Sequence, residues 1–72
     1  MKKVYKIENL DCPVCAGKMQ RAIEKIDGVE SCDVSFLLQK ITLEAEEEKL
    51  ETVMKKMVKT CRRVEPDIVI DL

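Results

Sequence analysis

The chain has 72 residues, 46% of them apolar, and a formal net charge of −1, because 14 acidic side chains nearly balance 13 basic ones. This balance excludes a typical nucleic-acid-binding module, which needs a basic face to neutralise phosphates. No apolar stretch approaches the ~20 residues that a membrane-spanning helix needs, and the N-terminus carries no apolar export signal. We therefore expect one domain over residues 1–72, located in the cytoplasm and not inserted in a membrane.

The first expected element is a strand over residues 2–8, in which apolar side chains alternate with polar ones. Asn9 follows and suits a turn with left-handed backbone geometry. Leu10 is expected to be a buried anchor for the loop after this strand. The loop opens the most informative stretch of the chain, residues 10–19, which reads Leu-Asp-Cys-Pro-Val-Cys-Ala-Gly-Lys-Met.

A helix is expected over residues 13–26. Pro13 suits its first turn, where the backbone N–H that proline lacks would have no partner. Apolar side chains recur at helical spacing and predict one buried stripe. The stripe consists of Cys15, Met19, Ala22, Ile23 and Ile26. Gly28 suits the end of the helix, because glycine adopts left-handed geometry without strain.

The rest of the chain predicts a hairpin, a second helix and a last strand. Alternating apolar side chains indicate strands over residues 30–37 and 40–46, close enough to form the hairpin. Residues 46–59 predict a helix with acidic side chains at its start and basic ones at its end, which complements the helix dipole. The last strand is expected over residues 64–72. Pro66 has no backbone N–H to donate, so it places this strand at a sheet edge or a bulge.

The order β-α-β-β-α-β predicts an α+β, ferredoxin-like fold, with an antiparallel four-stranded sheet and two helices on one face. This topology brings the first loop, the hairpin tip and the exit of the second helix to one end. Of the four cysteines, Cys12, Cys15 and Cys61 are expected at that end. Cys32 is expected at the opposite end, at the beginning of the second strand, with its thiol in the core and outside any metal site.

Cys12 and Cys15 form a Cys-x-x-Cys pair that spans a loop and a helix's first turn, so both sulfurs can point to one ion. The unpaired N–H groups and partial positive charge of a helix N-terminus lower the pKa of a thiol and favour the metal-binding thiolate. Thiolates prefer soft or borderline ions. A closed structural zinc site usually has four protein ligands. A single exposed pair leaves coordination positions open, which favours metal transfer over permanent binding.

Asp11 is a candidate third ligand, because a carboxylate adds charge and an oxygen donor for a divalent ion but contributes little to Cu⁺. Its alternative role is to cap the helix, for which aspartate is well suited. Cys61 is a candidate fourth ligand, and its alternative role is a partly buried thiol beside the site. The expected ions are Zn²⁺, Cd²⁺ or Pb²⁺, with Cu⁺ less favoured.

The sequence Leu-Asp-Cys-x-x-Cys-Ala at residues 10–16, on a βαββαβ chain, resembles the heavy-metal-associated (HMA) domain family. These are soluble metallochaperones and N-terminal domains of metal-transporting P-type ATPases. Their usual loop, Gly-Met-Thr-Cys-x-x-Cys, implies that Cys12 and Cys15 are the two cysteine ligands. The variant with Asp11 is similar to the zinc, cadmium and lead exporters, in which the aspartate also binds metal. A Cys-Arg pair at residues 61–62, where copper members tend to have Gly-Lys, also disfavours copper.

The resemblance implies a non-catalytic domain that binds and transfers a soft divalent ion, as the cytosolic N-terminal domain of a metal-exporting P-type ATPase. Its expected partners are the ion and either the membrane and ATPase domains of the transporter or a metal-donor protein. A monomer is expected, with a metal-bridged dimer as the alternative. Two other functions remain open: a free-standing copper or mercury metallochaperone, and a small thioredoxin-like thiol oxidoreductase, suggested by Cys-Pro-Val-Cys after a strand.

Overall fold

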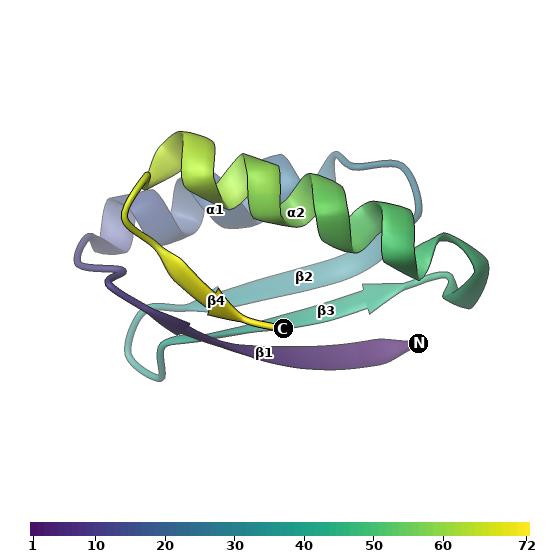
Figure 1. Cartoon of the computed structure of the whole chain (residues 1–72), viewed down its shortest axis with the longest axis horizontal. Helices are drawn as coiled ribbons and strands as arrows, with labels where there is room; N and C mark the ends of the chain where they lie inside the picture. The colour runs from purple at the N-terminus through teal and green to yellow at the C-terminus, as the bar shows by residue number, and fades with distance from the viewer.

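One antiparallel sheet of four strands carries both helices on the same face (Figure 1). The structure is a computed structural model that describes residues 1–72. Its elements in chain order are β1 (Lys2–Glu8), α1 (Pro13–Glu24), β2 (Val29–Ser35), β3 (Lys40–Ala45), the short 3₁₀ helix η1 (Glu47–Lys49), α2 (Leu50–Val64) and β4 (Val69–Asp71). This order confirms the predicted βαββαβ arrangement and ferredoxin-like fold class.

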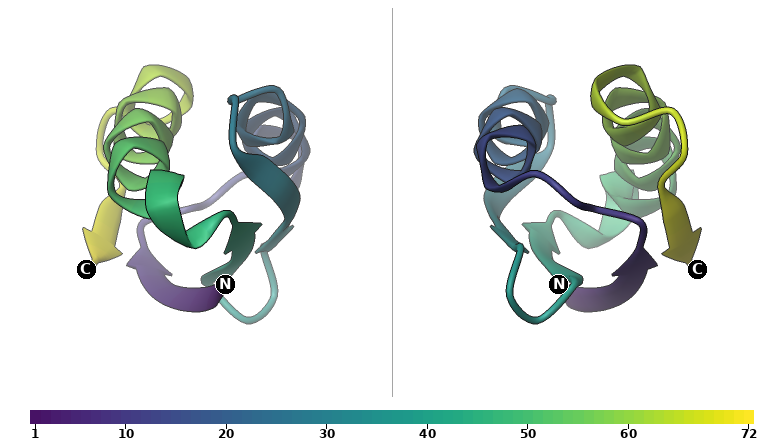
Figure 2. Two further views of the ribbon diagram at one scale, coloured as in Figure 1. Left: turned by 90° about the vertical axis from the view of Figure 1, so that its right-hand side faces the viewer. Right: turned by 90° about the vertical axis from the view of Figure 1, so that its left-hand side faces the viewer.

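The strands follow the order β2-β3-β1-β4 across the sheet, so β1 and β3 are central. Near the end of β1, Lys6 pairs with Lys40 of β3 on one side and with Asp71 of β4 on the other. β4 is an edge strand, as predicted, and pairs only with the last residues of β1. End-on views show the two helices side by side over the sheet, with the other face uncovered (Figure 2).

The core is a mostly aliphatic layer between the sheet and the helices. Alternation along the strands and helical spacing in the helices direct apolar side chains into this layer. The buried residues are Tyr5, Ile7, Leu10, Ala16, Met19, Ile23, Cys32, Val34, Ile41, Leu43, Ala45, Val53, Met57, Cys61 and Ile68. The Tyr5 hydroxyl donates a hydrogen bond to Sδ of Met54 at 3.3 Å. No charged side chain is buried, so apolar burial is the main stabilising contribution.

Three connections meet at one end of the molecule, on the left in Figure 1: the β1–α1 loop, the β2–β3 turn and the segment after α2. This is the juxtaposition that the topology predicted. Asn9, whose φ of 69° confirms the expected left-handed geometry, donates from Nδ2 to the Asp67 carbonyl at 3.1 Å. The Ile7 amide donates to the Gln39 carbonyl at 2.9 Å. These bonds tie the three connections together.

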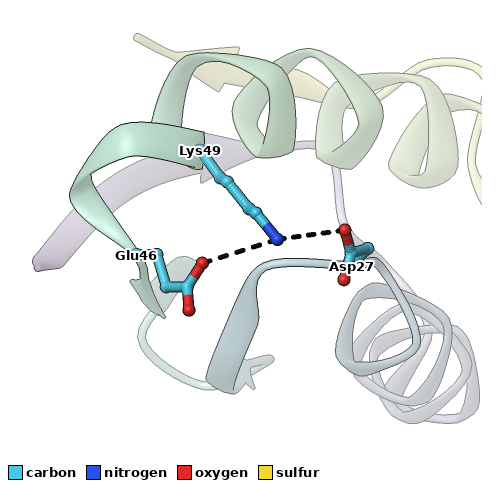
Figure 3. Close-up of polar contacts among 3 residues, drawn as sticks. All are labelled: Asp27, Glu46 and Lys49. Atoms are coloured by element: carbon cyan, nitrogen blue, oxygen red, sulfur yellow. Dashed lines mark hydrogen bonds and ion pairs between the residues drawn. The ribbon is translucent and has the colours of Figure 1, made fainter.

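An exposed cluster of charges joins the connections at the opposite end (Figure 3). Nζ of Lys49 lies 3.2 Å from Oδ2 of Asp27 and 3.5 Å from Oε2 of Glu46. The hydrogen bond that Lys49 donates to Asp27, together with the charges of the two carboxylates, raises the pKa of Lys49. Because these groups are solvated, they contribute little to stability, and they link the α1–β2 turn to η1 at the end remote from the cysteine pair.

α1 ends at Glu24, two residues before the predicted boundary. The amides of Lys25 and Ile26 bond to carbonyls three residues back, which tightens the last turn and ends the regular helix. Gly28 therefore lies beyond the cap, in the turn that leads to β2. Its φ is 98°, and an added Cβ would lie 3.0 Å from the side chain of Val53. Glycine is required there both by the backbone geometry and by the close approach of α2.

α2 and β4 differ most from the sequence prediction. The second helix was expected over residues 46–59, but η1 precedes it and α2 continues to Val64. Cys61 continues the buried face of α2, so apolar packing supports the extra turns. Pro66 then restricts Glu65 to an extended conformation (φ −136°, ψ 95°), which ends the helix. The last strand begins only at Val69 and leaves Pro66 outside the sheet.

Candidate metal centre

The cysteine pair lies where β1 has ended and α1 begins. Cys12 is the N-cap of α1, with extended backbone geometry (φ −128°, ψ 117°), and Pro13 occupies the first turn. The Cys15 amide donates to Sγ of Cys12 at 3.3 Å, and the Ala16 amide donates to the Cys12 carbonyl at 3.1 Å. The helix start therefore holds both motif cysteines within one turn, as the spacing predicted.

Only the motif thiols have access to solvent. Cys12 and Cys15 are partly exposed, and all four cysteines are free thiols. Cys32 and Cys61 are 5% and 0% exposed. An ion that arrives from solution can therefore reach the Cys12–Cys15 pair without disturbing the core.

The two motif thiols have opposite pKa shifts. The pKa of Cys12 is lowered because its thiolate accepts hydrogen bonds from the Cys15 thiol and the Cys15 amide, with a smaller contribution from the charge of Lys18. The pKa of Cys15 is raised because its thiol is the donor to Cys12, because it is partly desolvated and because Glu65 adds a nearby negative charge. Cys12 therefore loses its proton before Cys15 does.

Asp11 is exposed and takes part in no side-chain hydrogen bond or ion pair. The helix cap is supplied by Sγ of Cys12, so Asp11 does not fill the capping role that was its alternative. No three His, Cys, Asp or Glu side chains are grouped so as to hold a metal ion. The structure thus brings Cys12 and Cys15 together and leaves the Asp11 carboxylate adjacent in sequence but outside the pair.

Cys61 and Cys32 both lie in the core. Cys61 belongs to the last turns of α2, and burial raises its pKa to about 11. Cys32 lies in the middle of β2 rather than at its beginning, and faces the core as predicted; burial, followed by the charge of Cys61, raises its pKa to about 12. Neither thiol is grouped with the motif pair.

Two residues near the pair were not assigned from the sequence. Gln39 in the β2–β3 turn makes side-chain hydrogen bonds with the backbone of Leu10, which is 1% exposed and is the predicted anchor of the loop. Glu65 lies directly after α2 and its charge reaches Cys15. Neither residue belongs to a sequence motif. The only signal for them in the sequence was the predicted topology, which placed both connections at this end of the molecule.

Comparison with known proteins identifies the family. The model of the heavy-metal-associated domain family matches residues 4–63, which includes the cysteine pair, α1 and all but the last residue of α2. This chain belongs to the HMA domain family. The match excludes the thioredoxin-like alternative and identifies the chain as a metal-binding module rather than a catalytic domain. Neither helix of this HMA domain has the length and apolarity needed to cross a bilayer.

The relatives of this HMA domain include transporters named for different metals. It is 27% identical over 70 residues to a cadmium, zinc and cobalt-transporting ATPase of Bacillus subtilis, a match that covers 97% of this chain and 10% of the ATPase. It is 46% identical over 33 residues to a probable copper-transporting ATPase, PacS, of Synechocystis, covering 46% of this chain and 4% of that protein. The chain therefore spans a tenth or less of the length of these relatives.

The fold is shared with a solved metallochaperone structure. The CopZ metallochaperone superposes with a TM-score of 0.73 at 20% identity, covering 97% of this chain and 98% of the other. This superposition shows a shared fold, whereas the family match identifies the domain as a metal-binding unit. Because both copper and cadmium or zinc names occur among its relatives, the family alone leaves the metal open.

Proposed function

We propose that this HMA domain binds a soft divalent ion, Zn²⁺, Cd²⁺ or Pb²⁺, as transient cargo and passes it to a partner. The observation that carries the proposal is the pair of partly exposed thiols, Cys12 and Cys15, held within one helical turn while the other two cysteines are buried. Two thiolates bind a soft ion, and the open side of the pair lets an incoming ligand displace them.

Asp11 supports the preference for a divalent ion. Its carboxylate is exposed, directly precedes Cys12 and has no other bonding partner to give up. A third, negatively charged oxygen ligand adds more to the binding of Zn²⁺ or Cd²⁺ than to that of Cu⁺, which is satisfied by two sulfurs. The proposed ligands are therefore Cys12, Cys15 and Asp11. Cys61 would have to leave the core to bind the same ion, so we do not include it.

The relatives support a proposal for the biological setting of the domain. We propose that the domain serves at the cytoplasmic face of a metal-exporting P-type ATPase, where its partners are the membrane and ATPase domains or a metal-donor protein. The relative from Bacillus subtilis that matches nearly the whole chain is named for cadmium, zinc and cobalt. Copper delivery is the second candidate function, and the identity with PacS favours it.

Competition for binding among Cu⁺, Zn²⁺, Cd²⁺ and Pb²⁺ tests the choice of metal. Asp11→Ala should lower the affinity for the divalent ions by at least about tenfold, since even residues outside the ligand set commonly affect metal affinity to that extent. The affinity for Cu⁺ should stay within about twofold of the unmodified domain, because the oxygen ligand adds little to it.

Asp33→Ala is the matched control, because Asp33 is also an exposed aspartate but lies in β2 away from the pair. It should leave all four affinities unchanged. Equal losses for Cu⁺ and the divalent ions in Asp11→Ala, or no loss at all, would show that Asp11 is not a ligand and would favour the copper alternative.

A further inference from the structure

The side chain of Gln39 makes three hydrogen bonds at the end of the molecule that holds the metal loop, which is the loop between β1 and α1. Its Nε2 donates to the Leu10 carbonyl at 2.9 Å and to the Phe36 carbonyl at 2.7 Å. Its Oε1 accepts from the Leu10 amide at 3.3 Å. Only one orientation of the amide group satisfies all three, because Nε2 must face the two carbonyl oxygens. Gln39 thus binds both backbone polar groups of Leu10.

This contact extends the sheet beyond the end of β1. The regular β1–β3 pairing stops at Lys6 and Lys40. The Gln39 carbonyl then accepts from the Ile7 amide at 2.9 Å, and the Gln39 side chain pairs with Leu10 three residues further on. A φ of 51° at Gln39 turns its backbone into the tight geometry that permits both contacts. The side chain takes the place of an additional strand residue.

Leu10 depends on this pairing because it is 1% exposed. Buried backbone N–H and C=O groups are costly when unpaired, and water has little access to those of Leu10. The pairing therefore fixes the direction in which the chain leaves Leu10. The next two residues are Asp11 and Cys12, so the same bonds determine where the carboxylate and the first thiol begin.

We propose that Gln39 is the positioning residue of the metal loop. It holds Leu10 so that Asp11 and Cys12 are presented together with Cys15 to a divalent ion. This inference rests on the proposed function, because it assumes that these three side chains are the ligands. It adds a residue 27 positions beyond Cys12, in a different turn, to the determinants of metal affinity.

Gln39→Glu is the sharpest variant, since glutamate has nearly the same shape and still accepts from the Leu10 amide. It replaces the donor by an oxygen that faces the carbonyls of Leu10 and Phe36, where it is repelled. Gln39→Ala removes all three bonds. Gln20→Ala is the matched control: Oε1 of Gln20 also accepts from a backbone amide, that of Val34 at 3.1 Å, but it joins α1 to β2 and does not contact the loop.

Cd²⁺ titration of the whole domain gives the first measurement, with the ¹¹³Cd chemical shift as a report on the donor atoms. Both Gln39 variants should weaken Cd²⁺ binding by about tenfold, the usual scale for residues that orient ligands, and should shift the ¹¹³Cd resonance. Gln20→Ala should change neither the Cd²⁺ affinity nor the ¹¹³Cd resonance, even if it lowers the melting temperature as much as the Gln39 variants do. Unchanged affinity and resonance in the Gln39 variants would overturn the proposal.

Hydrogen exchange of the metal-free proteins separates this inference from the proposed function. The Leu10 amide should exchange at least about tenfold faster in Gln39→Ala, which removes its acceptor, than in the unmodified domain, and Gln20→Ala should leave it unchanged. Failure of the unmodified domain to bind Cd²⁺ would contradict the proposed function, whereas faster exchange at Leu10 would still support the role of Gln39 in holding the loop. Unchanged exchange at Leu10 would contradict that role whatever the metal result.

Discussion

The Cys12 and Cys15 thiols differ in how readily they lose a proton, although one helical turn holds both. Cys12 accepts hydrogen bonds from the thiol and the amide of Cys15, so its pKa is lowered, whereas the pKa of Cys15 is raised. A thiolate is the form that attacks an electrophile or binds a metal. Cys12 is therefore the thiol that ionises more readily, and metal binding releases the protons that the pair still holds.

Alkylation with limiting iodoacetamide at pH 7.5 tests this difference between the cysteines. Cys12 should be modified first, and Cys15 second. Cys32 and Cys61 should react on the order of 100-fold more slowly, because burial denies access and raises their pKa values to about 12 and about 11. Peptide mass mapping at several reaction times measures all four rates in one sample.

The same reaction in denaturant is the control, because all four unfolded thiols should then react at similar rates. Rapid modification of Cys61 in the folded domain would show that it reaches the surface. That result would restore Cys61 as a candidate ligand.

At the scale of elements, the turn at Gly28 fixes how α1 and α2 approach each other. Gly28→Ala forces a Cβ to within 3.0 Å of Val53 and places a side chain at φ 98°, so it should destabilise the domain by roughly 1–3 kcal/mol. Gly17→Ala should instead stabilise it by roughly 0.5–1 kcal/mol, because Gly17 lies within α1 and an added Cβ would be in ordinary contact, at 3.9 Å, with the Arg21 side chain.

Urea unfolding of both glycine variants, in reductant and chelator, measures these two changes. Both variants add the same methyl group but should change the free energy of unfolding in opposite directions, so each serves as the control for the other. A stabilised Gly28→Ala would mean that the turn and α2 are not packed as described.

Local patterns predicted most of the elements, and the errors have specific causes. Alternation was strong in the first three strands, and the Cys-Pro pair marked the start of α1. The end of α2 was missed because residues 60–64 are mostly polar and only Cys61 continues the buried face. Pro66 was taken as part of a strand, whereas it ends the helix. Gln39 could not be found locally, since its role depends on a contact with Leu10 across the fold.

For the whole molecule, the buried layer is aliphatic and contains no metal ligand set, so the metal-free domain should fold by apolar burial alone. Two buried thiols make that fold sensitive to alkali. Above pH 9 an unfolded cysteine loses its proton, whereas Cys61 keeps its proton up to about pH 11 and Cys32 up to about pH 12. The free energy of unfolding therefore falls as pH rises from 9 towards about 12. The stabilising contribution of the two protonated thiols is fully present below pH 9.

Unfolding by urea between pH 8 and pH 11, under reducing conditions, tests this pH dependence. The raised pKa of Cys61 alone corresponds to a loss of roughly 2 kcal/mol in the free energy of unfolding between pH 8 and pH 11, and the raised pKa of Tyr5 acts in the same direction. Cys61→Ala lowers stability at neutral pH because it leaves a cavity, but the slope of stability with pH should become shallower. A slope equal to that of the unmodified domain would show that Cys61 does not titrate as described.

The most direct test of the central claim is Cd²⁺ titration followed by the ultraviolet thiolate-to-metal charge-transfer band. The unmodified domain and Cys32→Ala, the matched control for a buried cysteine, should each bind one ion per chain with the same band. Cys12→Ser and Cys15→Ser should each lose tight binding and most of the band, because one thiolate remains. A full band in either serine variant, or an equal loss in Cys32→Ala, would contradict metal binding by the Cys12–Cys15 pair.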